Sequence, residues 1–163
     1  MDVNARRTGE RIAGLVYGTI VVMSVIAASS EGLERDPARI AGLVVATNFV
    51  FWLAHVYAHS VELSVVRRER LTGRGLKEVA VHEASILTAA VLPTGALLLG
   101  VLDFIGERRA IWLALAAGTA ALAGQGLALA RIEKLTLVGT AALVLTNVLL
   151  GLAIVGLEVF VSH

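Results

Sequence analysis

The sequence contains no cysteine, so disulfide bonds, thiolate metal ligands and thiol redox chemistry are all excluded. Charged residues make up only 17% of the 163 residues and aromatic residues 5%, whereas hydrophobic residues make up 57%. A soluble domain of this length cannot hide that much apolar surface. The composition therefore predicts a protein that is embedded in a membrane over most of its length.

Three motifs that mark common enzyme classes are also missing. The sequence has no Gly-x4-Gly-Lys-Ser/Thr phosphate loop, no Gly-x-Ser-x-Gly elbow and no His-Glu-x2-His zinc motif. His82 and Glu83 are adjacent, but the second histidine of the zinc motif is absent. These absences favour a function other than catalysis, and no nucleic-acid partner is expected.

Apolar runs long enough to cross a bilayer recur along the chain. A hydrocarbon core of about 30 Å needs roughly 20 apolar residues in a helix. The sequence therefore predicts an all-α integral membrane protein, a single domain over 1–163 with a bundle of about five transmembrane helices. The predicted spans are 12–29, 40–66, 79–102, 111–130 and 135–161. The first follows a basic segment, as a signal peptide does, but its length indicates a retained signal-anchor helix.

The two prolines predict local features of the second and third helices. Pro37 suits the first turn of the second helix, where its missing N–H has no cost. Pro93 falls inside the third helix, where it removes a backbone hydrogen bond and predicts a kink.

The distribution of basic residues predicts the orientation of the chain. With the N-terminus in the cytoplasm, ten of the fourteen Arg and Lys residues lie inside and four lie outside. The ten are Arg6, Arg7, Arg11, Arg67, Arg68, Arg70, Arg74, Lys77, Arg131 and Lys134. Because cytoplasmic loops carry an excess of positive charge, this orientation is favoured, with an external C-terminus. The expected location is the cell membrane, as a multi-pass protein with the lipid bilayer as a partner.

The fourth predicted helix carries small residues at four-residue spacing. Ala114 with Gly118 and Ala120 with Gly124 are examples. Small residues let helix backbones approach closely, so we expect this helix to pack against a neighbour or against a second copy of the chain. Five helices with short loops enclose little volume, so a homo-oligomer or a larger membrane complex is expected.

Polar residues inside the predicted spans are the candidate functional residues, because such groups are costly in a bilayer. Those on the second helix are spaced by seven, four and three residues, so they lie within about 40° of one line. The third helix leaves the same basic loop and adds polar residues at a similar depth. The predicted polar path comprises Asn48, His55, His59, Glu62, His82 and Glu83.

Two functions suit this path. Imidazole changes its charge near neutral pH and a carboxylate can accept a proton, so the leading hypothesis is a small channel or transporter for protons or another cation, without a cofactor. The alternative is a metal-binding protein or metalloenzyme, because His-x3-His places two nitrogens on one helical face and zinc or iron accepts such ligands. The metal ligands would be His55, His59, Glu62 and His82.

A third hypothesis is an accessory or scaffold subunit whose polar groups are satisfied internally. Buried histidines can hydrogen-bond a backbone carbonyl, and Glu62 and Glu83 can pair with the basic loop. The fifth helix carries a second polar stripe toward the outer side, formed by Thr140, Asn147 and Glu158. Asn48 and Asn147 can serve instead as interhelical hydrogen-bonding side chains.

Overall fold

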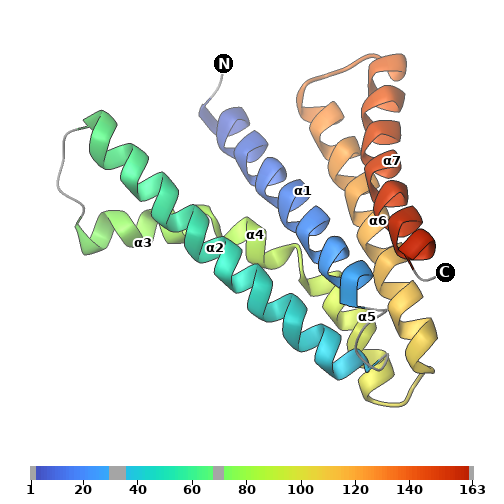
Figure 1. Ribbon diagram of the computed structural model, residues 1–163. Helices are drawn as coiled ribbons and strands as arrows, with labels where there is room; N and C mark the ends of the chain where they lie inside the picture. The colour runs from blue at the N-terminus through green and yellow to red at the C-terminus, as the bar shows by residue number, and fades with distance from the viewer. Residues whose placement is uncertain (1–2, 30–35, 68–71, 162–163) are drawn as a thin grey trace.

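The structure, a computed structural model, describes residues 3–29, 36–67 and 72–161, in which every regular element is a helix (Figure 1). Four of these helices are long and apolar enough to cross a membrane, and there are five such spans if one bent pair counts as a single span. The all-helical prediction and the number of potential spans are therefore confirmed. In chain order the helices are α1 (Val3–Ser29), α2 (Pro37–Arg67), α3 (Gly73–His82), α4 (Ala84–Thr88), α5 (Val91–Val101), α6 (Glu107–Ile132) and α7 (Leu137–Val161).

The helix α2 begins at Pro37, as the sequence predicts. Asp36 caps it, because Oδ1 of Asp36 accepts a hydrogen bond from the backbone N–H of Ala38 at 2.8 Å. Pro37 is buried and packs against α5, where a Cβ atom added to Gly100 would lie 3.1 Å from Cγ of the proline ring. Both the local cap and this tertiary contact therefore define the start of α2.

The third predicted span is divided into α3, α4 and α5 rather than forming one helix. The axis bends by 50° between the α3–α4 segment and α5. Pro93 explains this break, because it has no N–H to donate to the carbonyl of Ala89, four residues earlier. The N–H of Ala90 donates instead to Leu87 O at 3.3 Å, in a tighter turn. The kink that Pro93 predicts is present, one turn before the proline.

The helices α1 and α4 approach each other closely at two glycines. A Cβ atom on Gly18 would lie 2.8 Å from both Cβ of Ala89 and the carbonyl oxygen of Ile86. A Cβ atom on Gly14, one turn earlier, would collide with the hydroxyl of Ser85. Glycine at these positions lets α1 contact the backbone of the broken third span, as small residues do between membrane helices.

An apolar core lies mainly at the end of the bundle where α1 ends and α2 and α6 begin. Its members are Val22, Met23, Ile26, Ile40, Ala41, Val44, Ala90, Ala96, Leu97, Ile111, Ala114, Leu115 and Leu122. Small residues of α6 contribute as expected, because Ala114 and Gly118 are buried and Gly118 contacts Met23. Ala120 and Gly124 are exposed instead.

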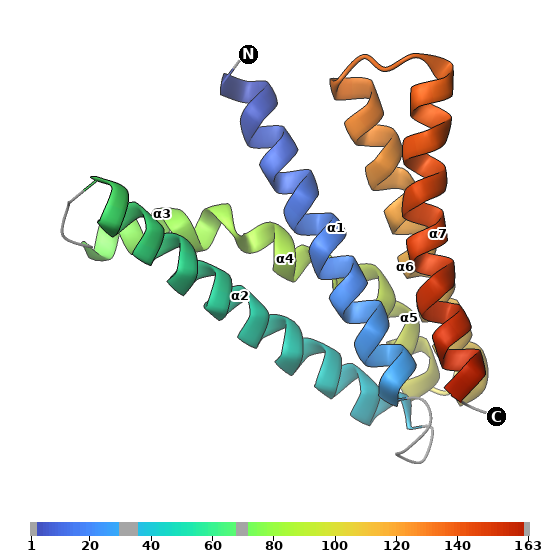
Figure 2. The same cartoon turned by 45° about the horizontal axis from the view of Figure 1, so that its top comes forward.

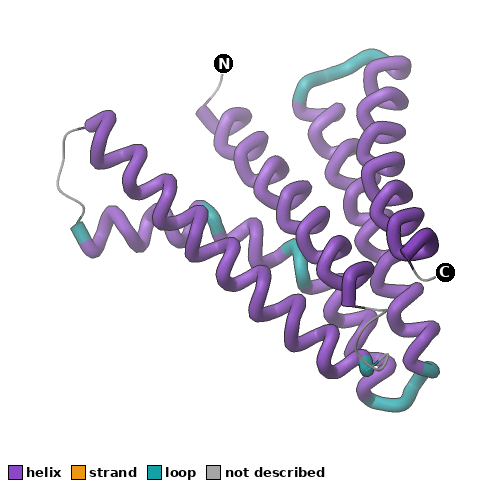
Figure 3. Tube along the Cα trace, in the orientation of Figure 1, coloured by secondary structure: helices purple, strands orange, loops and turns teal. Residues whose placement is uncertain are grey.

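The helices converge at this end and diverge at the other. Figures 1 and 2 both show α2 moving away from α1 toward the α2–α3 connection, while α6 and α7 stay side by side. The tube view in Figure 3 shows the breaks that separate α3, α4 and α5. The helices α3 and α4 run back along α2 and bring the residues around the first break close to α1.

Candidate functional site

Glu83 lies at the break between α3 and α4 and contacts His59 of α2. Nδ1 of His59 and Oε1 of Glu83 are 2.8 Å apart, the distance of a charge-assisted hydrogen bond. The two side chains are 34% and 15% exposed, respectively. Because Glu83 is in a turn rather than inside a continuous helix, this contact ties α2 to the third span where that span is interrupted.

A second imidazole and a second carboxylate extend this contact to α1. Nε2 of His82 lies 3.4 Å from Oε2 of Glu10. The rings of His59 and His82 meet edge to face, with their centroids 5.8 Å apart and their planes at 81°. Glu83, His59, His82 and Glu10 therefore follow one another across α2, α3 and α1, and we call these four residues the His/Glu network.

The formal charge of the network depends on the protonation of its two imidazoles. With both carboxylates ionised, its formal charge is −2 when the two imidazoles are neutral and 0 when both are protonated. Each imidazole has a carboxylate within ion-pair distance, so protonation produces a pair of opposite charges. This matters in a membrane, where an unpaired charge is far more costly than a paired one.

These contacts also determine which ring nitrogens are available to a proton. An ionised carboxylate only accepts hydrogen bonds, so Nδ1 of His59 carries the hydrogen in its bond to Glu83, whereas Nε2 of His82 lies at an ion-pair distance of 3.4 Å from Glu10. The other nitrogen of each neutral ring, Nε2 of His59 and Nδ1 of His82, keeps a free lone pair. Each ring thus has one nitrogen beside a carboxylate and a second nitrogen that can accept a proton.

Two further side chains of α2 position the broken span. Nε1 of Trp52 donates a hydrogen bond to Ala80 O at 3.0 Å. Nδ2 of Asn48 donates to Ile86 O at 2.9 Å, and this carbonyl lacks its usual helical donor because Ala90 N bonds elsewhere. Asn48 is only 2% exposed. It therefore acts as an interhelical hydrogen-bonding side chain at the second break.

His55 and Glu62 lie apart from the network, although the sequence pattern groups them with it. The ring of His55 faces Tyr17 of α1, with a centroid distance of 5.1 Å, and its Nδ1 donates to Phe51 O at 3.0 Å. Glu62 is exposed and makes no hydrogen bond or ion pair in the part of the chain that the structure describes. Of the six expected path residues, only His59, His82 and Glu83 join one another directly.

The sequence interpretation missed Glu10. This residue precedes Gly14 by four positions and Gly18 by eight, so all three share one face of α1. That spacing is a signal in the sequence, because the glycines bring α4 close to the same face. The contact between Nε2 of Gln125 and Oγ1 of Thr19, 3.0 Å long, was missed as well and joins α6 to α1.

The four expected metal ligands do not share one site. Within residues 3–29, 36–67 and 72–161, no group of three or more His, Cys, Asp or Glu side chains is placed to hold a metal ion. His59 and His82 are neighbours, but His55 faces Tyr17 and Glu62 is exposed. The expected ligand set is therefore dispersed over separate places along α2 and the third span.

Asn147, the central residue of the second predicted polar stripe on α7, has a structural role. Asn147 is buried, donates from Nδ2 to Leu143 O at 3.0 Å and packs against Gly126 of α6. Thr140 is half-buried on the same helix. The side chain of Glu158 lies outside the described residues.

The comparisons with known proteins give no match that bears on this site. The chain matches no protein-family model, and neither the curated proteins nor the solved structures give a match.

Proposed function

We propose that this chain is a small proton transporter of the cell membrane and that the His/Glu network is the cytoplasmic part of its proton path. The proposal rests on one observation, the unbroken order of carboxylate, imidazole, imidazole and carboxylate across three helices. Ionisable side chains inside membrane segments commonly form proton relays. Imidazole suits this role because it binds and releases protons near neutral pH.

The contacts support a simple sequence of proton exchanges. A proton that binds Nδ1 of His82 makes the ring cationic, and the ring can return to its neutral form by releasing the Nε2 proton to Glu10. His59 can perform the same exchange between its Nε2 atom and Glu83. In each exchange one proton arrives and one leaves, and no other bond changes. The two rings lie with their centroids 5.8 Å apart, so a proton would pass from one ring to the other through a bridging water.

The apolar core favours a transporter over a permanently open channel. Beyond Asn48, the bundle is closed by completely buried side chains such as Met23, Ile26 and Leu97. Protons do not cross a dry apolar layer that offers them no polar groups. Transport therefore requires a second arrangement in which this core opens while the network end closes, as in alternating access.

The divergence of the helices supports an assignment to the inward-open arrangement. The helices α1 and α2 separate at the network end, which the distribution of basic residues predicts to be cytoplasmic (Figures 1 and 2). A homo-oligomer is part of the proposal, with the exposed Ala120 and Gly124 of α6 as positions where helices of two copies can approach closely.

The test is a proton-flux assay on purified protein in liposomes. We expect the wild-type chain to dissipate an imposed pH gradient, and we expect Glu83→Gln to reduce the rate roughly tenfold or more, because the amide cannot take up a proton. Glu62→Gln is the matched control, since it removes an exposed carboxylate from α2 without touching the network. An inactive wild type, or equal rates for Glu83→Gln and the wild type, would contradict the proposal.

The same preparations separate the proton path from a metal site. Metal content is measured before and after treatment with a chelator, and flux is measured on both samples. We expect flux to be unchanged by the chelator. Stoichiometric zinc or iron that is lost together with flux would favour the metal-binding alternative.

A further inference from the structure

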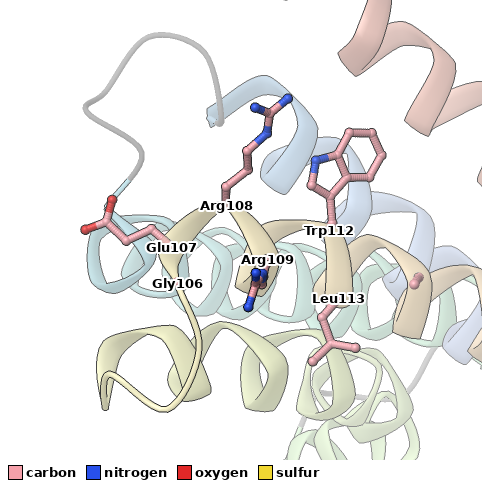
Figure 4. Close-up of a pocket in the computed structure, with 7 residues that line it drawn as sticks. Gly106, Glu107, Arg108, Arg109, Trp112 and Leu113 are labelled. Carbon is pink, nitrogen blue, oxygen red and sulfur yellow. The ribbon is translucent and has the colours of Figure 1, made fainter.

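An open pocket lies on the first turns of α6, at the opposite end of the bundle from the His/Glu network. Its volume is about 1080 Å³. Figure 4 shows the side chains that line it at one end of α6, with Arg108 and Trp112 on one side of the helix and Arg109 and Leu113 on the other. The lining residues that matter are Glu107, Arg108, Arg109, Trp112, Leu113 and Ala116.

The mouth of the pocket carries two guanidinium groups that have no partner among the described residues. Arg108 and Arg109 are exposed, and neither makes a hydrogen bond or ion pair within the part of the chain that the structure describes. Glu107 is the one acidic side chain among the pocket residues, so the lining has a formal charge of +1. Guanidinium groups bind phosphate oxygens through paired hydrogen bonds, so this charge suits a phosphate monoanion.

The rest of the lining is apolar. Trp112 lies one turn beyond Arg108 and Leu113 one turn beyond Arg109, so each arginine is followed along the helix by an apolar side chain. Ala116 is a further apolar lining residue. Exposed tryptophan is typical of the boundary between lipid headgroups and acyl chains. The lining therefore changes from cationic to apolar along α6, in the same order in which a phospholipid changes from headgroup to chain.

We propose that this pocket binds an anionic phospholipid of the leaflet at the N-terminal end of α6, predicted to be the outer leaflet. The phosphodiester would contact Arg108 and Arg109, and the first part of an acyl chain would cover Leu113 and Ala116. A second copy packed symmetrically on this face would bring like charges together. Inorganic phosphate would leave the apolar lining uncovered. Charge and polarity together thus favour the lipid.

The two tryptophans of the chain provide a direct assay. In a Trp52→Phe background, Trp112 is the only tryptophan, and its fluorescence reports lipids in contact with the pocket. The protein is reconstituted in phosphatidylcholine with either brominated phosphatidylglycerol or brominated phosphatidylcholine as quencher. We expect the anionic lipid to be preferred about three- to tenfold. Arg108→Gln combined with Arg109→Gln should abolish this preference, so that the two lipids quench about equally.

Three controls make the result decisive. Arg131→Gln changes a guanidinium at the other end of α6 and should leave the preference intact. Inorganic phosphate in millimolar excess should also leave it intact, and loss of the preference would identify a site for free phosphate instead. Native mass spectrometry of the unsubstituted protein gives an independent measure of retained phosphatidylglycerol, which matters because Trp52→Phe removes a hydrogen bond. Equal affinity for the two lipids, or a preference that survives loss of both arginines, would overturn the proposal.

Discussion

Nδ1 of His59 lies 2.8 Å from Oε1 of Glu83, although the two residues are 24 positions apart and belong to different segments. Glu83 lies between α3 and α4, and its N–H keeps the helical hydrogen bond to Val79 O at 2.9 Å. The contact with His59 therefore joins α2 to the third span, and the side chains of α2 that hold this span in place should matter as much as the network itself.

Asn48→Leu should destabilise the fold by about 0.5–2 kcal/mol, because Ile86 O would lose its hydrogen bond within a closely packed interface. The loss can be measured as a shift in the unfolding midpoint when SDS is added to the protein in mild detergent. Thr47→Val is the matched control, since the side chain of Thr47 has no hydrogen bond among the described residues. Equal midpoints for the two variants would argue against a stabilising role for Asn48.

Gly18→Ala should destabilise the contact between α1 and α4 by about 1–3 kcal/mol. The added Cβ would lie 2.8 Å from the backbone oxygen of Ile86, which cannot move as a flexible side chain can. Gly42→Ala provides the comparison, because no atom lies within 4 Å of a Cβ at that position. It should be neutral or stabilise α2 by up to about 1 kcal/mol through helix propensity. The same SDS titration distinguishes the two, and a neutral Gly18→Ala would mean that the helices are farther apart.

The two histidines of the His-x3-His pair should respond differently to substitution by phenylalanine. His55→Phe preserves an aromatic ring against Tyr17, so flux should remain within about twofold of the wild-type rate. His59→Phe removes the partner of Glu83, so flux should fall roughly tenfold or more. Equal losses of flux in both variants would indicate that His55 also belongs to the proton path.

The absence of cysteine makes the predicted orientation easy to test. Single cysteines at Thr72, Glu107 and Glu133 report the connections that precede α3, α6 and α7. In intact cells, a membrane-impermeant maleimide should label Glu107→Cys and leave Thr72→Cys and Glu133→Cys unlabelled until the cells are opened. The reverse pattern would invert the orientation and move the His/Glu network to the outside.

Local features of this fold and one contact between consecutive spans could be predicted from the sequence, whereas the contacts of α1 could not. The apolar runs, the capped start of α2 and the bend before Pro93 depend on neighbouring residues. The meeting of His59 with Glu83 follows from two consecutive antiparallel spans. The contact of Glu10 with His82 depends instead on how closely α1 approaches α4. That distance is set by the packing of Gly14 and Gly18 against α4.

His55 is a residue that the sequence pattern assigns to the network although the structure places it elsewhere. Its position on the helical stripe places it in line with His59, but that periodicity gives no information on which neighbouring helix covers each part of α2. Because α1 crosses α2 near Tyr17, His55 meets an aromatic ring rather than the third span. The crossing of two membrane helices is set by packing, not by the polar pattern of either one.

A double-mutant cycle on proton flux tests the central claim most directly. His59→Gln, Glu83→Gln and the double variant are reconstituted at equal density, and the initial rate of pH-gradient collapse is measured for each. If the pair acts as one element of the path, each single substitution abolishes most of the flux and the double variant is no worse than either. Wild-type flux in the double variant, or losses that simply multiply, would contradict the account.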